Sequence, residues 1–515
     1  MAEPFYLTTA INYPNGRPHI GHAYEAIAAD AIARFQRLMG RDVRFQTGTD
    51  EHGLKMVQTA RDRGVAVRAL ADEMSSAFKE MAAKLNISCD RFIRTTDADH
   101  YAASQAIWQA MADAGDLYLA RYEGWYSVRD EAFYDEKELV GEGDAKLSPQ
   151  GTPVEWTAEE SWFFRLSRYQ QPLLDFYAAH PEFIQPESRR NEVLRFVEGG
   201  LSDLSVSRTS FDWGVPVPGA PGHVMYVWVD ALTNYLTGTG YPGWDGDLKR
   251  YWPADLHLIG KDIVRFHAVY WPAFLMSAKL PLPRRVFGHG FVLARDGAKM
   301  SKSAGNVADP LALAESYGVD ALRYFLLRDI SFGQDGTWSE EAIVARANAD
   351  LANSFGNLAQ RTLSFIAKNL DGALPEPGRA EPADAELLAA IAEAAAAYRA
   401  QFADLALSQA VESWMKAVFA CNAYIDAQAP WSLRKTDPAR MHAVLGTLVR
   451  AIHDLALLIQ PVIPESAAKI LAQIGAPAGD FARLGDDGWY RALAAAGHRI
   501  APPSGVFPRL EAPAA

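Results

Sequence analysis

Two histidines near the start of the chain have a spacing suited to phosphate binding. His19 and His22 flank Gly21 where a β-branched run, residues 5–11, and a turn lead into a helical apolar pattern. At a helix N-terminus the first backbone N–H groups lack helical partners, and the helix dipole adds partial positive charge. A phosphate would be attracted there between two imidazoles, and Gly21 would leave room for a nucleotide. Taken alone, the pair is equally consistent with a metal site or a helix cap.

Two lysines later in the chain could complement these histidines. Lys299 and Lys302 belong to the segment KMSKS, residues 299–303, with Gly297 before it and Gly305 after it. Small residues would allow this loop to move, and two ammonium groups could neutralise the charge that develops on a pyrophosphate leaving group. Alone, the segment could be a solvated basic loop. The order of the two motifs, about 280 residues apart, is much more specific than either motif.

Together the two motifs resemble the class I aminoacyl-tRNA synthetases. The resemblance implies attack by an amino-acid carboxylate on the α-phosphorus of ATP, release of pyrophosphate, and transfer of the aminoacyl group to the terminal ribose of tRNA. Mg²⁺ bound with ATP would share the charge. The resemblance assigns catalysis to His19, His22, Lys299 and Lys302, and further ATP contacts to Gly21, His289, Met300 and Ser301. For His289, a structural role in its Gly-His-Gly turn is the alternative.

Two further segments narrow the family. Residues 10–37 and the segment TGTDEHG, residues 47–53, are similar to methionyl-tRNA synthetases, and the similarity extends over nearly the whole chain. It implies that Ile11 and Tyr13, at the end of the first predicted strand, line a methionine pocket. Asp50 follows the second predicted strand, at the sheet edge where such folds bind ligands. Its carboxylate could pair with the ammonium group of the substrate.

Two stripes of apolar and aromatic residues could form the rest of this pocket. Trp228, Ala231 and Tyr235 have i, i+3, i+7 spacing, and Ile263, His267 and Trp271 have i, i+4, i+8 spacing, so each set shares a helix face. A thioether pairs well with aromatic rings, and the hydroxyl of the first stripe and the imidazole of the second could donate to its sulfur. Core packing is the alternative, and the match to the family favours a pocket.

The region between the two halves of the catalytic domain also discriminates among relatives. At about 110 residues it is too short for the editing domain typical of the valyl, isoleucyl and leucyl enzymes. Cysteinyl enzymes normally bring a cysteine-ligated zinc, but this chain has only Cys89 and Cys421. Many methionyl enzymes carry Cys-x-x-Cys zinc knuckles, and here Ser127 and Asp130 take the positions of the first pair. We therefore predict a knuckle-shaped subdomain without metal, held by its aromatic residues.

A helical pattern in the last third carries a candidate RNA-reading surface. Asn357 and Arg361 are four residues apart on one helix face, and the pair Pro430-Trp431 interrupts another helical pattern and exposes an indole. An amide, a guanidinium and a flat ring can bind and stack on unpaired bases. A buried tryptophan and an unrelated surface pair are the alternative. The resemblance implies that these residues read the CAU anticodon, so the expected partners are initiator and elongator tRNA(Met).

The elements that must position these residues form an α/β chain of several parts. Strand, turn, helix and strand patterns at the start predict a βαβ unit and a parallel sheet. We expect a Rossmann-like catalytic domain in two halves, residues 1–114 and 224–295, split by an inserted connective domain, residues 115–223. Residues 296–345 would hold the KMSKS loop and a stem-contact region. Residues 346–515 would form an α-helical bundle that binds the anticodon, with a tail that wraps back or frays.

Composition bounds the remaining classes. The 515 residues carry a net charge of −13, yet six basic residues face one acid between Lys279 and Lys302, so local phosphate binding stays open. No apolar run approaches the length of a membrane span and no leader pattern is visible, which predicts a cytoplasmic protein. The end of the chain soon after residues 506–511, VFPRLE, favours a monomer. A nucleotidyltransferase of the HxGH type and a non-catalytic tRNA-binding paralogue are the rival interpretations.

Overall fold

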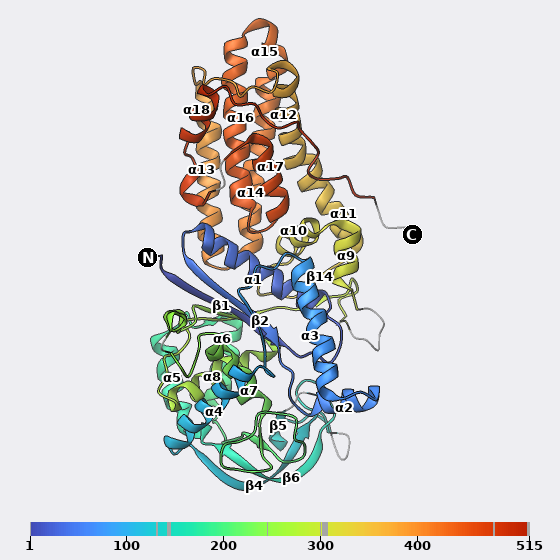
Figure 1. Cartoon of the computed structure of the whole chain (residues 1–515), viewed down its shortest axis with the longest axis vertical. Coiled ribbons are helices and arrows are strands. Elements are labelled where there is room, and N and C mark those ends of the chain that lie inside the picture. The colour runs from blue at the N-terminus through green and yellow to red at the C-terminus, as the bar shows by residue number, and fades with distance from the viewer. Residues whose placement is uncertain are drawn as a thin grey trace.

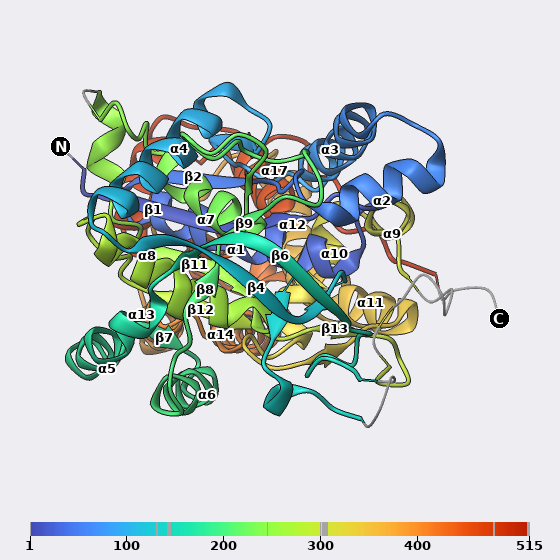
Figure 2. The same cartoon turned by 90° about the horizontal axis from the view of Figure 1, so that it is seen from below.

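The computed structural model shows an elongated molecule with an α/β body at one end and a helical bundle at the other (Figure 1). The structure describes residues 2–129, 132–141, 146–244, 246–298, 300, 307–476 and 479–511. In Figure 1 the bundle helices stand above the sheet, and the long hairpin of the insertion lies at the opposite end, which Figure 2 views from below. The two ends of the molecule are thus joined through the sheet and helix α1.

A six-stranded parallel sheet forms the centre of the body. Its order is β3-β2-β1-β11-β12-β7 and every pairing in it is parallel. The strands are β1 (Pro4–Asn12), β2 (Asp42–Thr49), β3 (Arg91–Arg94), β7 (Ile184–Gln185), β11 (Leu256–Gly260) and β12 (Val286–His289). This order reverses direction between β1 and β11, and ligands of such sheets bind outside the carboxyl ends of the strands at that point. The predicted Rossmann-like fold is confirmed.

Side chains alternate across β1 and separate two layers. Phe5 and Leu7 belong to a core shared with α1 and the bundle, whereas Tyr6 belongs to a core on the other face. Helices on the first face include α1 (Ile20–Leu38) and α3 (Val67–Lys84); those on the second include α4 (Ala98–Asp113), α7 (Val227–Thr237) and α8 (Trp271–Ser277). Helix α2 (Leu54–Arg63) follows the loop after β2. Gly40, with φ of 81°, lies just after the end of α1, where a left-handed backbone conformation favours glycine.

The predicted insertion, residues 115–223, is only partly separate from the catalytic sheet. Its antiparallel sheet has the order β5-β4-β6-β8, formed by β4 (Leu117–Ser127), β5 (Ala132–Tyr134), β6 (Glu155–Phe164) and β8 (Leu204–Ser205). Between β6 and β8, however, β7 pairs with β12 and belongs to the parallel sheet, flanked by α5 (Gln170–Ala179) and α6 (Glu187–Glu198). Assigning the whole range to one inserted unit is therefore wrong. A two-residue strand has too little periodicity to be seen in the sequence.

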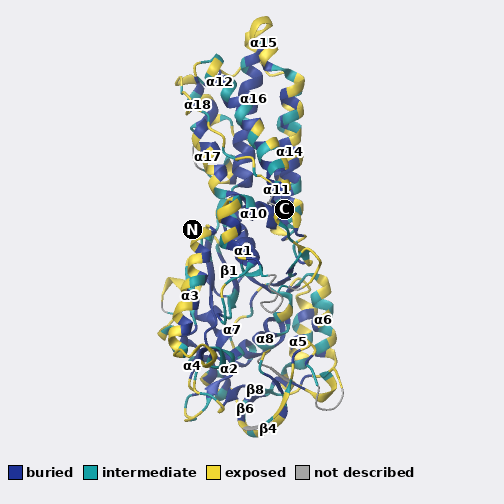
Figure 3. Ribbon diagram, turned by 90° about the vertical axis from the view of Figure 1, so that its right-hand side faces the viewer, coloured by how far each residue is buried: buried dark blue, intermediate teal, exposed yellow. Residues whose placement is uncertain are grey.

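The last third is helical, as predicted. After α9 (Pro310–Tyr317), α10 (Val319–Asp329) and α11 (Glu340–Arg346) the chain enters the π-helical segment η7 (Ala347–Gly356). The bundle then comprises α12 (Asn357–Asn369), α13 (Pro382–Ala403), α14 (Leu407–Gln428), α15 (Pro430–Thr436), α16 (Pro438–Ile459), α17 (Pro464–Ile474) and α18 (Gly488–Ala495). Helix α16 is long and apolar enough to cross a membrane, but 89% of its apolar window is buried within the bundle, so core packing accounts for its composition. Figure 3 shows this buried interior.

One arginine links the body and the bundle. Arg323 on α10 is fully buried and donates to Asp30 of α1 at 2.6 Å. It also donates to four backbone carbonyls, at 3.0 Å to Val462 and Pro461 before α17, and at 3.1 and 3.4 Å to Leu85 and Asn86 after α3. Buried charges persist when they are paired and fully hydrogen-bonded. Arg323 therefore joins α1, α3 and the bundle at one point.

The C-terminal tail returns along the bundle. Of the two predicted alternatives, wrapping back and fraying, the described part of the tail follows the first. The amide of Leu510 donates to Asn348 Oδ1 at 2.8 Å, and the Asn348 amide donates back to the Leu510 carbonyl at 2.9 Å. Gln473 exchanges hydrogen bonds with the backbone of Ser504 in the same way. Such paired side-chain contacts replace the β-ladder that an irregular segment lacks.

Candidate active site

The two motif histidines cap the N-terminus of α1. His19 is the N-cap residue, and its Nδ1 accepts from the backbone N–H of Gly21 at 3.1 Å, while His22 Nδ1 accepts from the N–H of His19 at 3.1 Å. The two rings stack with centroids 3.8 Å apart. Because each Nδ1 accepts a hydrogen bond, the proton of each neutral ring lies on Nε2. The helix-cap interpretation and the phosphate interpretation are therefore compatible, since capping occupies only one nitrogen of each ring.

Gly21 leaves room for the side chain of His19. A Cβ atom at this position would lie 2.9 Å from Cε1 and 3.0 Å from Nδ1 of His19. The missing side chain therefore accommodates the folded-back His19 ring, and the predicted contact of Gly21 with a nucleotide stays a prediction. Any larger residue would displace this imidazole from the cap.

His289 lies at the end of β12, next to α1, with both ring nitrogens engaged. Nδ1 lies 2.8 Å from the Gly290 carbonyl and Nε2 lies 2.9 Å from Oε2 of Glu25, one turn after His22. Burial raises the pKa of Glu25. Burial alone would lower the pKa of His289, but hydrogen bonding and the charge of Glu25 outweigh it and raise that pKa. These contacts support the structural alternative for His289.

The KMSKS motif lies mostly outside the described residues. Lys299, Ser301 and Lys302 are among the positions that the structure does not describe. Met300 is described and packs, half-buried, against the core shared by α1 and the bundle. The assignment of the two lysines thus remains a prediction.

One face of α7 forms an apolar wall, which we define by Trp228, Ala231 and Tyr235 and name the α7 wall. Ala231 and Tyr235 are buried, and Trp228 is half-buried. The Trp228 ring stacks on Phe266, with centroids 3.8 Å apart and planes 5° apart. Phe266 lies outside the i, i+4, i+8 stripe that marks the second wall in the sequence. The predicted sharing of one helix face by the three wall residues is confirmed, and Phe266 adds to it.

The facing stripe belongs to an irregular helix. Ile263 ends the 3₁₀ turn η4 (Lys261–Ile263), His267 lies in the π-helical turn η5 (Phe266–Tyr270), and Trp271 begins α8. The prediction of a regular helical face is therefore wrong in detail. The three residues nevertheless stay on one side, because His267 Nδ1 lies 3.0 Å from the Ile263 carbonyl and Trp271 packs 6.0 Å from the Tyr235 ring. π-Helical turns occur often at functional sites.

Hydrogen bonds fix the donors and acceptors at this wall. A carbonyl oxygen only accepts, so His267 Nδ1 carries the proton and Nε2 accepts from the Tyr235 hydroxyl at 2.6 Å. Burial lowers the pKa of His267 to about 4 and keeps the ring neutral. The prediction that both groups donate to a sulfur atom is therefore wrong for this structure, because their protons are used between themselves and with Ile263.

A second histidine, absent from the sequence-based prediction, lies behind this pair. His257 on β11 is fully buried, with its ring centroid 4.1 Å from that of Tyr235 and Nδ1 2.7 Å from Thr8 Oγ1. Burial lowers its pKa well below the usual value. Only its place in the parallel sheet, two strands from β2, brings it to the wall, so helical spacing could not reveal it.

Residues from the ends of β1 and β2 complete the candidate pocket. Ile11 lies near the end of β1, and Tyr13 directly follows this strand. The Tyr13 hydroxyl donates to the His52 carbonyl at 2.9 Å and accepts from the Met56 N–H at 3.3 Å. Asp50 is buried directly after β2, and its N–H donates to the Asn12 carbonyl at 2.8 Å. The predicted position of Asp50 at the carboxyl edge of the sheet is thus confirmed.

Helix α15 lies at the far end of the bundle (Figure 1), and its Trp431 contacts Arg361 of α12. Asn357 begins α12 and is exposed, and the Arg361 guanidinium lies 5.2 Å from the centroid of the Trp431 ring. Pro430 opens α15 after α14 ends at Gln428, and the Trp431 side chain is 45% exposed. Arg361 also donates to Asp426 at 2.7 Å. The predicted break and exposed indole are confirmed, and we name these residues the α15 tip.

Comparisons with known proteins agree with this geometry. Residues 5–363 match the family model described as class I tRNA synthetases (M), and residues 374–514 match the anticodon binding domain of methionyl tRNA ligase. The methionine–tRNA ligase of Brucella suis biovar 1 is 57% identical over 508 residues, which cover 98% of each chain. The chain belongs to the methionyl-tRNA synthetases. That of Mycobacterium bovis is also 57% identical, over 99% of each chain.

A solved methionyl-tRNA synthetase has the same fold. The Mycobacterium tuberculosis enzyme in complex with methionyl-adenylate superimposes with a TM-score of 0.93 at 56% identity, over 98% of this chain and 100% of that one. The predicted family, fold and methionine–tRNA ligase activity are therefore confirmed.

The region that carries zinc knuckles in many methionyl-tRNA synthetases contains hydroxyl groups in this chain. Ser127 Oγ lies 2.7 Å from Thr152 Oγ1, which lies 2.8 Å from Ser148 Oγ, and all three residues are buried. Nearby, Trp125 packs edge-on to Trp156. Asp130 lies outside the described residues. Within the described ranges no group of three histidine, cysteine or acidic side chains could hold a metal; the metal-free knuckle remains a prediction.

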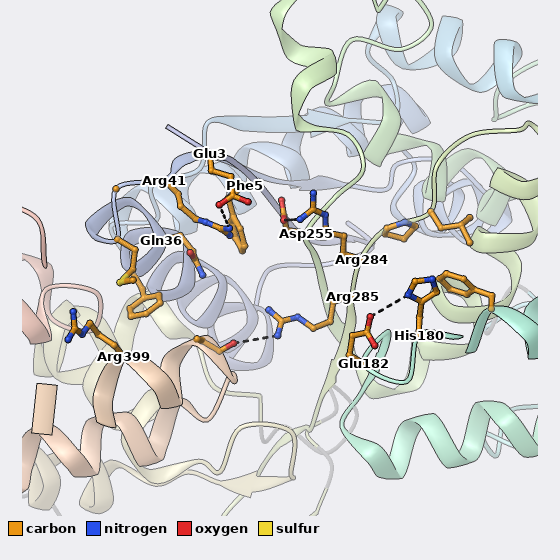
Figure 4. A pocket seen from close by; sticks show the side chains of 17 residues that line it. Glu3, Phe5, Gln36, Arg41, His180, Glu182, Asp255, Arg284, Arg285 and Arg399 are labelled. Atoms are coloured by element: carbon orange, nitrogen blue, oxygen red, sulfur yellow. Dashed lines mark hydrogen bonds and ion pairs between the residues drawn. The ribbon is translucent and has the colours of Figure 1, made fainter. Parts of the chain in front are cut away.

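A large cavity lies away from the candidate site residues. It has a volume of about 1080 Å³ and lies beside the amino ends of the strands, next to α13 (Figure 4). Its lining includes Arg41, which pairs with Glu3, and Arg284, which pairs with Asp255. Active sites of such sheets lie at the opposite edge, so size alone does not make this cavity the active site.

Proposed function

We propose that this chain activates methionine with ATP, forming methionyl-adenylate and releasing pyrophosphate, in the space bounded by the α1 cap, the loop of Asp50 after β2 and the α7 wall. The observation that carries the proposal is the convergence of these elements at the switch point of the sheet, between β1 and β11. Asp50 would hold the substrate ammonium, because a buried carboxylate at this edge is a strong partner for a cation. Its placement fixes which end of the amino acid faces the nucleotide.

The methionine side chain is assigned to the apolar surface between the α7 wall and the facing stripe of Ile263, His267 and Trp271. Ile11, Tyr13, Trp228, Ala231, Tyr235, Ile263, His267 and Trp271 supply its lining. A thioether is weakly polar and polarizable, so aromatic rings favour it over a charged side chain. The neutral state of His267 supports this role, because a protonated imidazole would disfavour an apolar ligand.

Phosphate binding is assigned to the Nε2–H groups of His19 and His22. Their Nδ1 atoms are held by backbone N–H groups, so both donors have fixed orientation before the nucleotide binds. Lys299 and Lys302, with Met300 and Ser301, would close over the pyrophosphate, and Mg²⁺ bound to ATP would share its charge. His289 would act on the nucleotide only indirectly, through Glu25 and α1.

The α15 tip is assigned to the CAU anticodon of initiator and elongator tRNA(Met). Trp431 offers a flat exposed surface, Pro430 precedes it in α15, and the Arg361 guanidinium lies over its ring. Asn357 is exposed one helical turn before Arg361 on α12. Stacking and edge hydrogen bonds are the usual means of reading unpaired bases. We further propose a cytoplasmic monomer without structural zinc, in which the stem-contact region covers residues 296–345.

ATP–pyrophosphate exchange with each amino acid, with and without tRNA, tests this function. Exchange that depends on methionine and not on tRNA is expected. Exchange with another amino acid would overturn the methionine pocket, and absence of exchange with intact tRNA binding would instead support a non-catalytic tRNA-binding protein. Metal analysis of protein treated with a chelator tests the zinc proposal separately, and stoichiometric zinc would refute it.

A further inference from the structure

A buried cluster of two histidines and one aspartate connects the Asp50 loop to α7. Asp230 lies on α7 between Trp228 and Ala231 of the α7 wall, on a different face of the helix. Its Oδ2 accepts from His52 Nδ1 at 2.6 Å, and its Oδ1 accepts from His100 Nε2 at 2.6 Å. All three side chains are at most 1% exposed. We name this cluster the Asp230 clamp.

The clamp joins three elements that are distant in sequence. His52 follows Asp50 by two residues, His100 is in the first turn of α4, and Asp230 is on α7. His100 Nδ1 also lies 2.9 Å from Thr237 Oγ1, almost two turns further along α7. His52 Nε2 lies 2.9 Å from the hydroxyl of Tyr101 on α4. The loop is therefore attached both to α7 and to the helix packed against it.

The carboxylate is ionised in this setting. Burial alone would raise the pKa of Asp230, but the two imidazoles lower it to about 2. An ionised carboxylate accepts at both oxygens, so His52 Nδ1 and His100 Nε2 both carry protons directed at it. The tautomer of each ring and its orientation are thus set by one side chain.

The residue on the other side of Asp50 is anchored independently. Glu51, fully buried, receives two hydrogen bonds from Arg94 at 2.6 and 2.9 Å and one from Thr49 at 2.8 Å. The Trp213 indole donates to the Glu51 carbonyl at 2.6 Å. Glu51 therefore fixes the loop to β3 and to the segment before α7, whereas His52 fixes it to α7 itself. Asp50 lies between these two anchors.

We propose that Asp230 is a positioning residue for amino-acid recognition: through His52 it sets the distance between the Asp50 carboxylate and the α7 wall. The substrate ammonium binds at one end of this distance and the end of the side chain at the other, so the clamp fixes the length of amino acid that fits both. This inference rests on the proposed role of Asp50. Asp230 touches no substrate, and its effect is transmitted by geometry, which active sites require to within a fraction of an ångström.

The first test compares Asp230→Asn with wild-type enzyme in ATP–pyrophosphate exchange. An asparagine cannot accept from both histidines, so the loop loses one attachment. We expect KM for methionine to rise roughly tenfold or more, since small displacements at a reacting centre have large effects, with KM for ATP nearly unchanged. The preference for methionine over ethionine, whose side chain is one carbon longer, should also fall. A merely structural role would leave this preference at the wild-type value.

A matched control separates positioning from stability. Asp384→Asn makes the same change at a buried carboxylate of the bundle, where Asp384 accepts from Arg440 at 2.6 and 2.8 Å. It should lower the melting temperature without changing KM for methionine or the preference over ethionine. If Asp230→Asn behaves like this control, the proposal is overturned. If wild-type enzyme shows no methionine-dependent exchange, the proposed function fails instead.

A pair of His52 variants keeps the test decisive if Asp230→Asn does not fold. His52→Asn places an amide donor near the position of Nδ1 and should retain most of the wild-type KM and preference. His52→Leu removes the donor and should show the same defects as those expected of Asp230→Asn. Equal kinetics for the two variants would refute the clamp, whichever values they share.

Discussion

The α7 wall and the α15 tip are built by opposite means. At the wall the polar groups of Tyr235 and His267 have partners inside the protein: Tyr235 donates to His267, and His267 donates to the Ile263 carbonyl. At the tip the indole of Trp431 is half exposed, and Arg361 pairs with Asp426, an exposed acidic side chain. A π-helical segment lies next to each region: η5 contributes residues that pack on the wall, and η7 directly precedes α12. The difference suits a small ligand that is enclosed and a large one that docks from outside.

Asp50→Asn should give the largest difference between the two regions. Truncating one partner of a buried charge pair costs about 2–5 kcal/mol. The kcat/KM for methionine in pyrophosphate exchange should therefore fall by roughly thirtyfold or more. Affinity for tRNA, measured by filter binding, should stay the same. A parallel loss of tRNA affinity would mean that the two regions are not separate.

The wall should also respond to pH where the tip does not. The pKa of His267 is about 4 in the folded chain and about 6.5 when unfolded, so between these values the unfolded state binds the additional proton. Stability is therefore lost as pH falls below about 6.5, by about 2 kcal/mol at pH 5 from this residue. Urea unfolding of wild-type and His267→Gln proteins at pH 7 and 5 measures the difference. If the two proteins lost the same free energy of unfolding between pH 7 and pH 5, the assignment of a neutral buried ring would be contradicted.

Trp431→Ala should separate charging from activation. Base stacking on an aromatic side chain is worth about 1–3 kcal/mol, so aminoacylation of tRNA(Met) should fall by about fivefold to 150-fold while pyrophosphate exchange persists. Because the Trp431 ring is 45% exposed, the free energy of unfolding should change little. Equal losses in both reactions would show that the tip supports the catalytic body and does not read RNA.

The smallest effect is expected for the ion pair at the tip. Arg361 and Asp426 have side chains 32% and 63% exposed, and exposed pairs contribute at most about 1 kcal/mol. Asp426→Asn should therefore leave the free energy of unfolding almost unchanged, whereas Asp384→Asn, at a buried pair, should lower it clearly. Comparable losses in the two variants would remove the distinction between an open tip and a closed interior.

Sequence patterns predicted the regular elements and the ends of strands well. His19 and Asp50 lie where a strand–turn–helix pattern and a strand end predict them, and Trp431 lies at the predicted helix break. These predictions depend on local chain geometry, which a short segment largely determines. The helical periodicity of 3.6 likewise placed Trp228, Ala231 and Tyr235 on one face.

Features that depend on the third dimension were not predicted. His257 reaches the wall only because β11 lies beside β1, and β7 enters the main sheet from within the expected insertion. The direction of the proton between Tyr235 and His267 depends on the Ile263 carbonyl, which lies at the end of the 3₁₀ turn η4, whereas His267 lies in the π-helical turn η5. Asp230, His52 and His100 are far apart in the sequence, so no spacing rule connects them.

Arg323 limits bending between the α/β body and the helical bundle. Five hydrogen bonds hold this guanidinium between α1, α3 and the start of α17, so bending at the junction would break several of them together. The separation between the His19 cap and the α15 tip is then a fixed length, like that of a caliper. If the His19 cap holds the acceptor end and the α15 tip reads the anticodon, as we propose, an RNA in which these two parts lie a different distance apart must deform to reach both.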